Sequence, residues 1–483
     1  MKIVPGILAV AVTTTSVAFA QQPDEATPVA EEPPSADQLA QRLQGLLGRP
    51  GGLTAKEAAR RATADSPSVR RARTHIAVAD AERTQALVGF FPRLTLTAQY
   101  TRLSPVDQPN VSGAFNLVGT AAPEGPIPPG TPLVAVPLTF PVILDQYLLQ
   151  ANLTVPITDI ALRTVHQYAA AGHSRRAAEL EVEAADRGTG ANAKLAYYDW
   201  VRARMQEAVA EQTLAQSQTH LDAARALEAG GRASRADVMA AQAQVANGEL
   251  LVQRAKNAAT SALDRLRHRM RDTKAQPYEI GESLPSHTPP LASLRDHYRR
   301  AMRKRPELEV LDEQARSLER QRKAAVAGSA PRLDAFGNVY YSNPNQRVFP
   351  QVEEFRATWD VGARLTWSPN DVPGSLAQAD VFEARRAELV AQREELRDTV
   401  RDEVRQAYFA LRDARAALAT TERSLAAAEE AYRVRAERFR YGRASAVELA
   451  DSEADLFRAR LDRIDAQVGL RVAEVRLSHA IGR

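Results

Sequence analysis

The sequence has 483 residues, of which 44% are hydrophobic and 25% are charged, and this composition excludes a wholly disordered chain. The formal net charge is +4, but basic and acidic residues alternate along the chain, as in Arg401-Asp402-Glu403. Interspersed charge is typical of solvated helix faces and argues against a nucleic-acid-binding patch. The chain has no cysteine, which excludes disulfides, cysteine–zinc sites, thiol catalysis and a lipid-modified N-terminal cysteine.

The first twenty residues are predicted to be a secretory signal peptide. Lys2 supplies a positive charge, an apolar stretch follows, and Ala18-Phe19-Ala20 resembles a cleavage site. A membrane-anchoring helix is the alternative, but Pro5 interrupts the stretch, which is also short. No later stretch is apolar over 18 residues, so we expect any membrane span to consist of β-strands. Residues 21–50, which are rich in acidic residues and proline, are expected to form a flexible leader.

The rest of the chain carries one pattern twice. Pro92-Arg93-Leu94 recurs as Pro331-Arg332-Leu333, and Gly231-Arg232-Ala233-Ser234 recurs as Gly442-Arg443-Ala444-Ser445. The first of these matches spans 239 positions and the second spans 211, and other matching residues have the same two spacings. One insertion in the first copy accounts for the difference between the two spacings. We therefore predict two structural repeats, over residues 51–276 and 277–483.

Each repeat begins with a helix and continues with two strands. The helices are predicted over residues 54–88 and 291–327, because Pro92 and Pro331 follow them. The strands are predicted at about 94–103 and 147–156 in the first repeat, and at about 333–341 and 358–367 in the second.

Apolar and polar residues alternate along all four predicted strands. About ten residues of alternation, with aromatic side chains, is typical of a transmembrane β-strand. A soluble antiparallel sheet would alternate too, and is the alternative. The aromatic residues expected to anchor the strands in the membrane are Tyr100, Tyr147, Tyr341, Trp359 and Trp367.

Long helices complete each repeat. No proline occurs after Ser375, and apolar residues recur every seven positions from Val404 to Phe439, which predicts a coiled-coil seam. Gly442 and the capping box from Ser445 to Glu448 interrupt this seam, so we predict a helical hairpin. The first repeat has matching signals, namely Gly230, Gly231, Ser234 and Asp237.

Four strands cannot close a barrel by themselves. An open edge in lipid leaves backbone groups unpaired, so the chain is expected to pool its strands with other copies of itself. Two copies would give eight strands and a filled interior, and three would leave a lumen. The strand number alone does not choose between them.

The order of signal peptide, helix, two strands and long hairpin, repeated once, is similar to that of the TolC-like outer-membrane efflux proteins. Residues 231–238 and 442–449 resemble the hairpin-tip motif of that family. The resemblance covers nearly the whole mature chain.

This resemblance implies a mostly α fold with a membrane β-barrel portion, assembled as a homotrimeric α/β barrel tunnel. It implies a passive duct for small molecules in the outer membrane of a Gram-negative bacterium, extending into the periplasm. The partners it implies are a periplasmic adaptor (a membrane fusion protein), an inner-membrane pump and outer-membrane lipid. It does not identify the transported molecule, because the pump mainly selects it.

The resemblance also implies two sets of site residues. The residues expected to contact the adaptor are Gly230, Gly231, Ser234, Asp237, Gly442, Arg443 and Ser445. Glu448 and Asp451 match two acidic positions of the family's periplasmic gate, although a capping role already explains Glu448. The first repeat has Ala240 where the second has Asp451, which suggests that the second hairpin lines the gate.

Other candidate sites are weak. Gly188 and Gly190 lie in a charged helical context that does not suit a dinucleotide loop. His166 and His173 lack a third metal ligand nearby in sequence. We see no nucleophile with a base, and so expect no enzyme activity, cofactor or metal. The long loop over 104–146 could be a lid, a phage contact or an inert surface loop. The alternative function is that of a periplasmic coiled-coil adaptor without a barrel.

Overall fold

The computed structural model describes residues 36–105, 116–118, 133–135, 142–274, 276–284, 290–441 and 443–483. The predicted signal peptide, much of the predicted leader and Gly442 lie outside the described residues. The chain divides into two compact units. The hairpin unit comprises Met1–Leu46, Ala203–Ala259 and Thr421–Ile464, and the sheet unit comprises Leu47–Arg202, Thr260–Thr420 and Asp465–Arg483. Both units take segments from both predicted repeats, so neither unit corresponds to one repeat.

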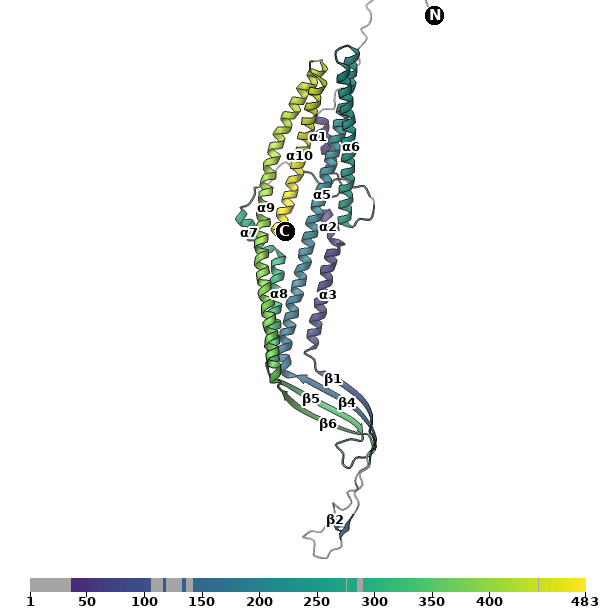
Figure 1. The fold of residues 1–483 in the computed structure, drawn as a ribbon, viewed down its shortest axis with the longest axis vertical. Coiled ribbons are helices and arrows are strands. Elements are labelled where there is room, and N and C mark those ends of the chain that lie inside the picture. Colours follow the sequence, from purple (N-terminus) through teal and green to yellow (C-terminus); the bar gives the residue numbers. More distant parts are fainter. Residues whose placement is uncertain are drawn as a thin grey trace, which may run out of the picture. The chain divides into compact units, whose positions relative to one another are not determined.

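Four long strands of the sheet unit form one antiparallel sheet. The strands are β1 (Arg93–Arg102), β4 (Asp145–Pro156), β5 (Arg332–Asn343) and β6 (Arg356–Thr366). They lie side by side in the order β1-β4-β5-β6 (Figure 1). Each strand overlaps one of the four segments that the alternation predicts. Two short strands inside the long loop, β2 (Asn116–Val118) and β3 (Leu133–Ala135), pair with each other and were not predicted.

The helical segment before each strand pair is broken, so the prediction of one continuous helix is wrong in both repeats. The first segment consists of α2 (Ala55–Ala64) and α3 (Pro67–Val88), and the second of α7 (Leu294–Lys304) and α8 (Pro306–Val326). A proline occupies the first position of both α3 and α8. Its ring disfavours helical geometry at the preceding residue, and Ser66 and Arg305 are accordingly extended, with ψ of 130° and 110°.

The remaining elements are helical. The long helices are α5 (Val165–Ala229), α6 (Arg235–Met270), α9 (Val372–Arg440) and α10 (Ala446–Ala480), and α1 (Ala36–Leu46) is shorter. Single turns occur at α4 (Ile157–Asp159), η1 (Ile160–Thr164), η2 (Ala327–Ser329) and η3 (Pro369–Asp371). None of the helices that the structure describes is both long enough and apolar enough to cross a membrane.

The seven-residue apolar pattern of α9 is a buried seam, as predicted. In the sheet unit, Val404, Leu411 and Leu418 belong to one buried cluster with Leu470 and Leu477 of α10. In the hairpin unit, α9 supplies Phe439 to a second cluster, which also contains Leu221 and Leu449. Burial of these side chains holds the long helices in pairs.

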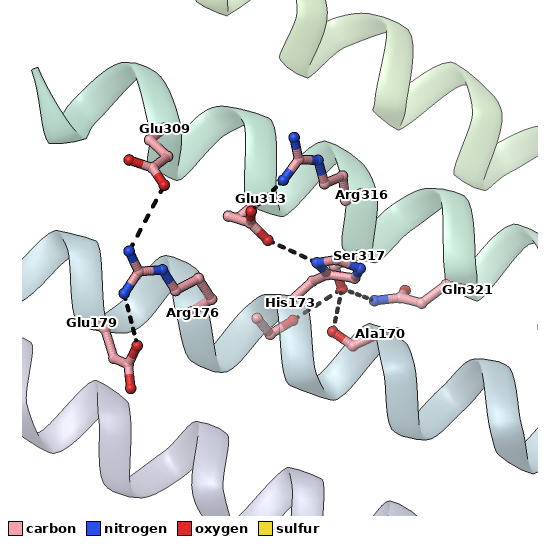
Figure 2. A network of polar contacts seen from close by, with 10 residues as sticks. Ala170, His173, Arg176, Glu179, Glu309, Glu313, Arg316, Ser317 and Gln321 are labelled. Carbon is pink, nitrogen blue, oxygen red and sulfur yellow. Dashed lines mark hydrogen bonds and ion pairs between the residues drawn. The ribbon is translucent and has the colours of Figure 1, made fainter. Parts of the chain in front are cut away.

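A polar network joins α5 to α8 inside the sheet unit (Figure 2). Glu313 is buried, and its carboxylate lies 2.7 Å from His173 Nδ1 and accepts a 2.5 Å hydrogen bond from Arg316. Ser317 donates to the carbonyl oxygen of Ala170 over 3.0 Å. His173 therefore has a carboxylate partner from the other repeat. No group of three or more metal-binding side chains occurs among the described residues.

Candidate functional site

The four-stranded sheet has one apolar and one polar face. Residues that pair directly across an antiparallel ladder share a face, so the register assigns every side chain. Leu96 pairs with Ala151, Ala151 with Val339, and Val339 with Trp359. The apolar face thus carries Leu94, Leu96, Ala98 and Tyr100 of β1; Tyr147, Leu149, Ala151, Leu153 and Val155 of β4; Leu333, Ala335, Gly337, Val339 and Tyr341 of β5; and Ala357, Trp359, Val361, Ala363 and Leu365 of β6.

This apolar face is open to the surroundings in the single chain. Leu96 is 74% exposed, Val361 is 73% exposed and Leu365 is 69% exposed. A contiguous apolar face of this kind is unfavourable in water, because apolar surface costs about 25 cal/mol per Å² relative to a nonpolar environment. The apolar face of the sheet is therefore suited to being covered by lipid or by another apolar surface.

The opposite face of the sheet is mostly polar, although it includes Leu148 and Phe336. On it, the amide of Asn338 donates to Asp360 over 2.7 Å and accepts from Asn152. Asn338 is buried, and its side chain connects β4 to β6. Hydrogen-bonding side chains on this face can contact water while the other face contacts lipid.

Aromatic residues lie at both ends of the apolar face. At the loop end, the rings of Tyr100 and Tyr147 have centroids 5.1 Å apart, and Tyr341 stacks on Phe355 at 5.1 Å. Phe355 also contacts Tyr147, at 5.9 Å, and so joins the two pairs into one cluster. The sequence analysis missed Phe355, whose only signal is an aromatic residue directly before a strand. Such amphipathic clusters are typical of membrane–water interfaces.

The two tryptophans predicted as anchors do not belong to the tyrosine cluster. Trp367 follows β6 at the helix end of the sheet, and its indole donates to the carbonyl oxygen of Ser329 over 3.3 Å. Trp359 lies within the sheet opposite Val339, one same-face position along the ladder from the pair of Ala357 and Tyr341, and so borders the tyrosine cluster. The membrane-anchoring role of all five aromatic residues stays a prediction.

The hairpin ends have the caps that the sequence predicts. Ser445 and Glu448 exchange two hydrogen bonds: the amide of Glu448 donates to Ser445 Oγ over 3.3 Å, and the amide of Ser445 donates to Glu448 Oε2 over 3.2 Å. Ser234 and Asp237 form the corresponding pair, with distances of 3.2 Å and 3.0 Å. These bonds satisfy backbone groups that a helix start leaves free.

The turn before each cap is tight. The amide of Gly230 donates to Ala226 O over 3.2 Å at the end of α5, and Gly231 has a φ of +70°. Only glycine adopts this left-handed geometry without strain. In the second hairpin, the amide of exposed Arg443 donates to Arg438 O over 2.8 Å.

The two hairpin ends also bind each other, which the sequence did not predict. Asp237 Oδ1 accepts a hydrogen bond from the amide of Ala446 over 3.2 Å, and Arg232 donates to the carbonyl oxygen of Tyr441 over 2.9 Å. The hydrogen bonds from Ser234, together with that from Ala446, lower the pKa of Asp237. Asp237 therefore caps its own helix and holds the start of α10.

The two predicted gate carboxylates differ in their contacts. Both Glu448 and Asp451 are exposed. The Glu448 carboxylate is occupied by the cap, whereas the Asp451 side chain makes no hydrogen bond or ion pair with the part of the chain that the structure describes. Ala240, the corresponding residue of α6, packs beside a buried cluster of the hairpin unit instead. Of these two carboxylates, only that of Asp451 lacks a partner among the described residues.

A buried ionisable cluster lies in the hairpin unit, and the sequence analysis missed it. His220 Nε2 is 3.1 Å from Glu453 Oε1 and 2.7 Å from the hydroxyl of Tyr432. Burial raises the pKa of Glu453 to about 7, and burial, with a smaller effect of Arg440, lowers the pKa of His220 to about 4. The three residues come from α5, α9 and α10, so no local spacing in the sequence connects them.

Comparison with solved structures defines the class of fold. The chain is similar to the outer-membrane channel OprN, with 18% identity over 89% of both chains and a TM-score of 0.68. It is similar to CusC, with 15% identity over 89% of this chain and 92% of that one and a TM-score of 0.70. It is also similar to the MtrE channel of Neisseria gonorrhoeae, with 16% identity, coverage of 89% and 88%, and a TM-score of 0.69. The chain has the fold of outer-membrane channels.

The family follows from the sequence itself. The model of the outer membrane efflux protein family matches residues 58–270 and 297–483, and the chain belongs to this family. No curated protein matches the chain in a sequence search. The chain is accordingly an efflux protein of the outer membrane that extends into the periplasm. This membership replaces the alternative of a periplasmic adaptor.

Proposed function

We propose that three copies of this chain form a passive channel through the outer membrane. The observation that carries the proposal is the sheet, which has an exposed apolar face and two edge strands, β1 and β6. The unpaired backbone groups of both edges would be costly in lipid. Because β1 and β6 run in opposite directions, β6 of one copy can pair antiparallel with β1 of the next, and a ring of copies closes the sheet.

The charged residues on the polar face of the sheet support an assembly of three copies rather than two. Two copies would make an eight-stranded barrel, whose interior is just wide enough for side chains. The polar face here carries charged residues, such as Asp360 and Arg364, which favour contact with water. Twelve strands leave a water-filled lumen for them. The resemblance to TolC-like proteins supports the same number.

The channel is proposed to work as one part of a tripartite efflux or secretion system. The other parts are a periplasmic adaptor and an inner-membrane pump, and the pump supplies the energy. The hairpin ends would contact the adaptor, and Asp451, with Glu448, would line the gate. Residues 1–20 would be the signal peptide that directs export. Small molecules are the proposed cargo.

Assembly and conduction test this function together. Purified protein in mild detergent should have the mass of a trimer by native mass spectrometry, and cross-linking should trap the same species. Planar bilayers containing this trimer should show single-channel currents. A protein that remains monomeric and leaves bilayers non-conducting would contradict the proposal.

A further inference from the structure

The first part of the loop between β5 and β6, residues 344–347, folds onto the polar face of the sheet. We call this segment the strap. Its residue Asn345 is only 3% exposed. The side-chain amide of Asn345 donates to the carbonyl oxygen of Arg356 over 2.9 Å and to Thr358 Oγ1 over 3.2 Å. Thr358 belongs to the polar face, so the start of the strap is held on that face.

Arg347 attaches the strap a second time. Its guanidinium donates to Asp360 Oδ2 over 2.7 Å and to the carbonyl oxygen of Trp359 over 2.8 Å. The guanidinium also lies over the ring of Tyr340, at 5.7 Å from the centroid. Asp360 and Tyr340 both point from the polar face, so these contacts orient Arg347 across β5 and β6.

The strap overhangs a cleft that has both polar and apolar lining residues. The cleft has a volume of about 390 Å³. Its lining includes Gln99 of β1, Gln146 of β4, Ser342 of β5, and Asn345, Gln346 and Arg347 of the strap. Residues of three strands thus face the strap across an open space, which indicates that the strap stands above the polar face while Asn345 and Arg347 fix it there.

We infer that the strap is a built constriction at the loop end of the channel, and that Arg347 and Asn345 set its width. The inference rests on the proposed function, in which the polar face lines the lumen. Three straps would then project inward from the wall. Because hydrogen bonds and an ion pair hold each strap, the constriction would impose an upper size limit on solutes that pass this end of the channel.

The absence of cysteine from the sequence allows a direct test. A Thr366→Cys variant places one thiol on the polar face of β6, six residues beyond Asp360 towards the helix end of the sheet, and Leu365→Cys places one on the apolar face next to it. Intact cells are treated with water-soluble polyethylene glycol maleimides of increasing mass. We expect Thr366→Cys to be labelled only by the small reagents, since the larger ones cannot pass the straps.

The strap is then loosened in the Thr366→Cys background. Arg347→Gln removes the ion pair and Asn345→Ala removes the amide bridge, and each should raise the largest reagent that labels the thiol. Arg364→Gln is the matched control: Arg364 lies on the same face of β6, but its guanidinium contacts Phe336 and not the strap. The control should keep the original size limit.

The possible outcomes distinguish a failure of the strap proposal from a failure of the proposed function. If all of these proteins have one size limit, or if the unmodified strap admits every reagent, the constriction is refuted while the channel remains. If Leu365→Cys reacts with the water-soluble reagents as readily as Thr366→Cys, the apolar face is not in lipid and the proposed function fails.

Discussion

The buried pair of His220 and Glu453 predicts an unusual dependence of stability on pH. Burial lowers the pKa of His220 from 6.5 to about 4 and raises that of Glu453 from 4.5 to about 7. Each change corresponds to about 3 kcal/mol as an order of magnitude. Below pH 4.5 the contribution of Glu453 is fully present, and it is lost as the pH rises towards 7. The contribution of His220 is fully present above pH 6.5, and it is lost as the pH falls towards 4.

The two contributions oppose each other in the same pH window. Between about pH 4.5 and 6.5, the folded pair holds one proton on Glu453, and the unfolded chain holds one proton on His220. The number of bound protons is then the same in both states, so this pair gives the wild-type protein almost no slope of stability against pH. The charged side chains near this pair are Arg440, Arg460 and Glu429.

Single substitutions should reveal the two dependences of stability on pH that cancel in the wild-type protein. Glu453→Gln leaves His220 alone, and stability should then rise by up to about 3 kcal/mol between pH 4.5 and 6.5. His220→Gln leaves Glu453 alone, and stability should fall over the same window by a similar amount. The opening free energy of α10, measured by hydrogen exchange at several pH values and corrected for the intrinsic rate, reports both slopes.

Asp455→Asn is a suitable control, because Asp455 lies on the same helix and is exposed. It should keep the flat profile of the wild-type protein. Equal slopes in Glu453→Gln and His220→Gln would refute the reasoning, since the pair would not then exchange one proton for the other.

Three further predictions concern the hairpin ends and the gate. Gly231→Val should destabilise the first hairpin by about 1–2 kcal/mol, because φ is +70° there. Thermal unfolding checks this against Gly172→Val, since a Cβ added at this helical glycine would meet no neighbour within 4 Å. Asp237→Ala should cost about 1 kcal/mol and speed hydrogen exchange at the starts of both α6 and α10, whereas loss of protection in α6 alone would argue against the bridge to α10. Asp451→Ala should weaken both divalent-cation block and cation preference in bilayer recordings, with Asp455→Ala as the control; unchanged recordings would remove Asp451 from the gate.

Patterns that depend on near neighbours could be predicted from the sequence. Side-chain alternation located all four strands of the sheet, because the period of a strand is two residues wherever one face is apolar. The seven-residue pattern predicted the seam of α9, and the capping boxes predicted where α6 and α10 begin. The helix breaks at Pro67 and Pro306 were missed even though the prolines are visible, because a proline at the first turn also suits a continuing helical segment.

The residues of the candidate sites also fall into two groups, those that the sequence could identify and those that it could not. The glycine, serine and acidic residues of the hairpin ends could be named from the sequence, because turns and caps have local signatures. Phe355, His220 and the contact of Asp237 with Ala446 could not, because each depends on segments that are far apart in the chain.

The sequence by itself determined the periodic elements, their caps and the two-faced character of each strand, since these properties follow from the spacing of residues a few positions apart. Only the tertiary structure decided which elements pair: that β4 lies between β1 and β5, that Glu453 reaches His220, and that Arg347 folds back to Asp360. Those contacts form when long segments pack against each other, and many partners of similar polarity would satisfy the same local pattern. Geometry selects one of them, because a buried charge or amide is stable only where a specific partner lies within hydrogen-bonding distance.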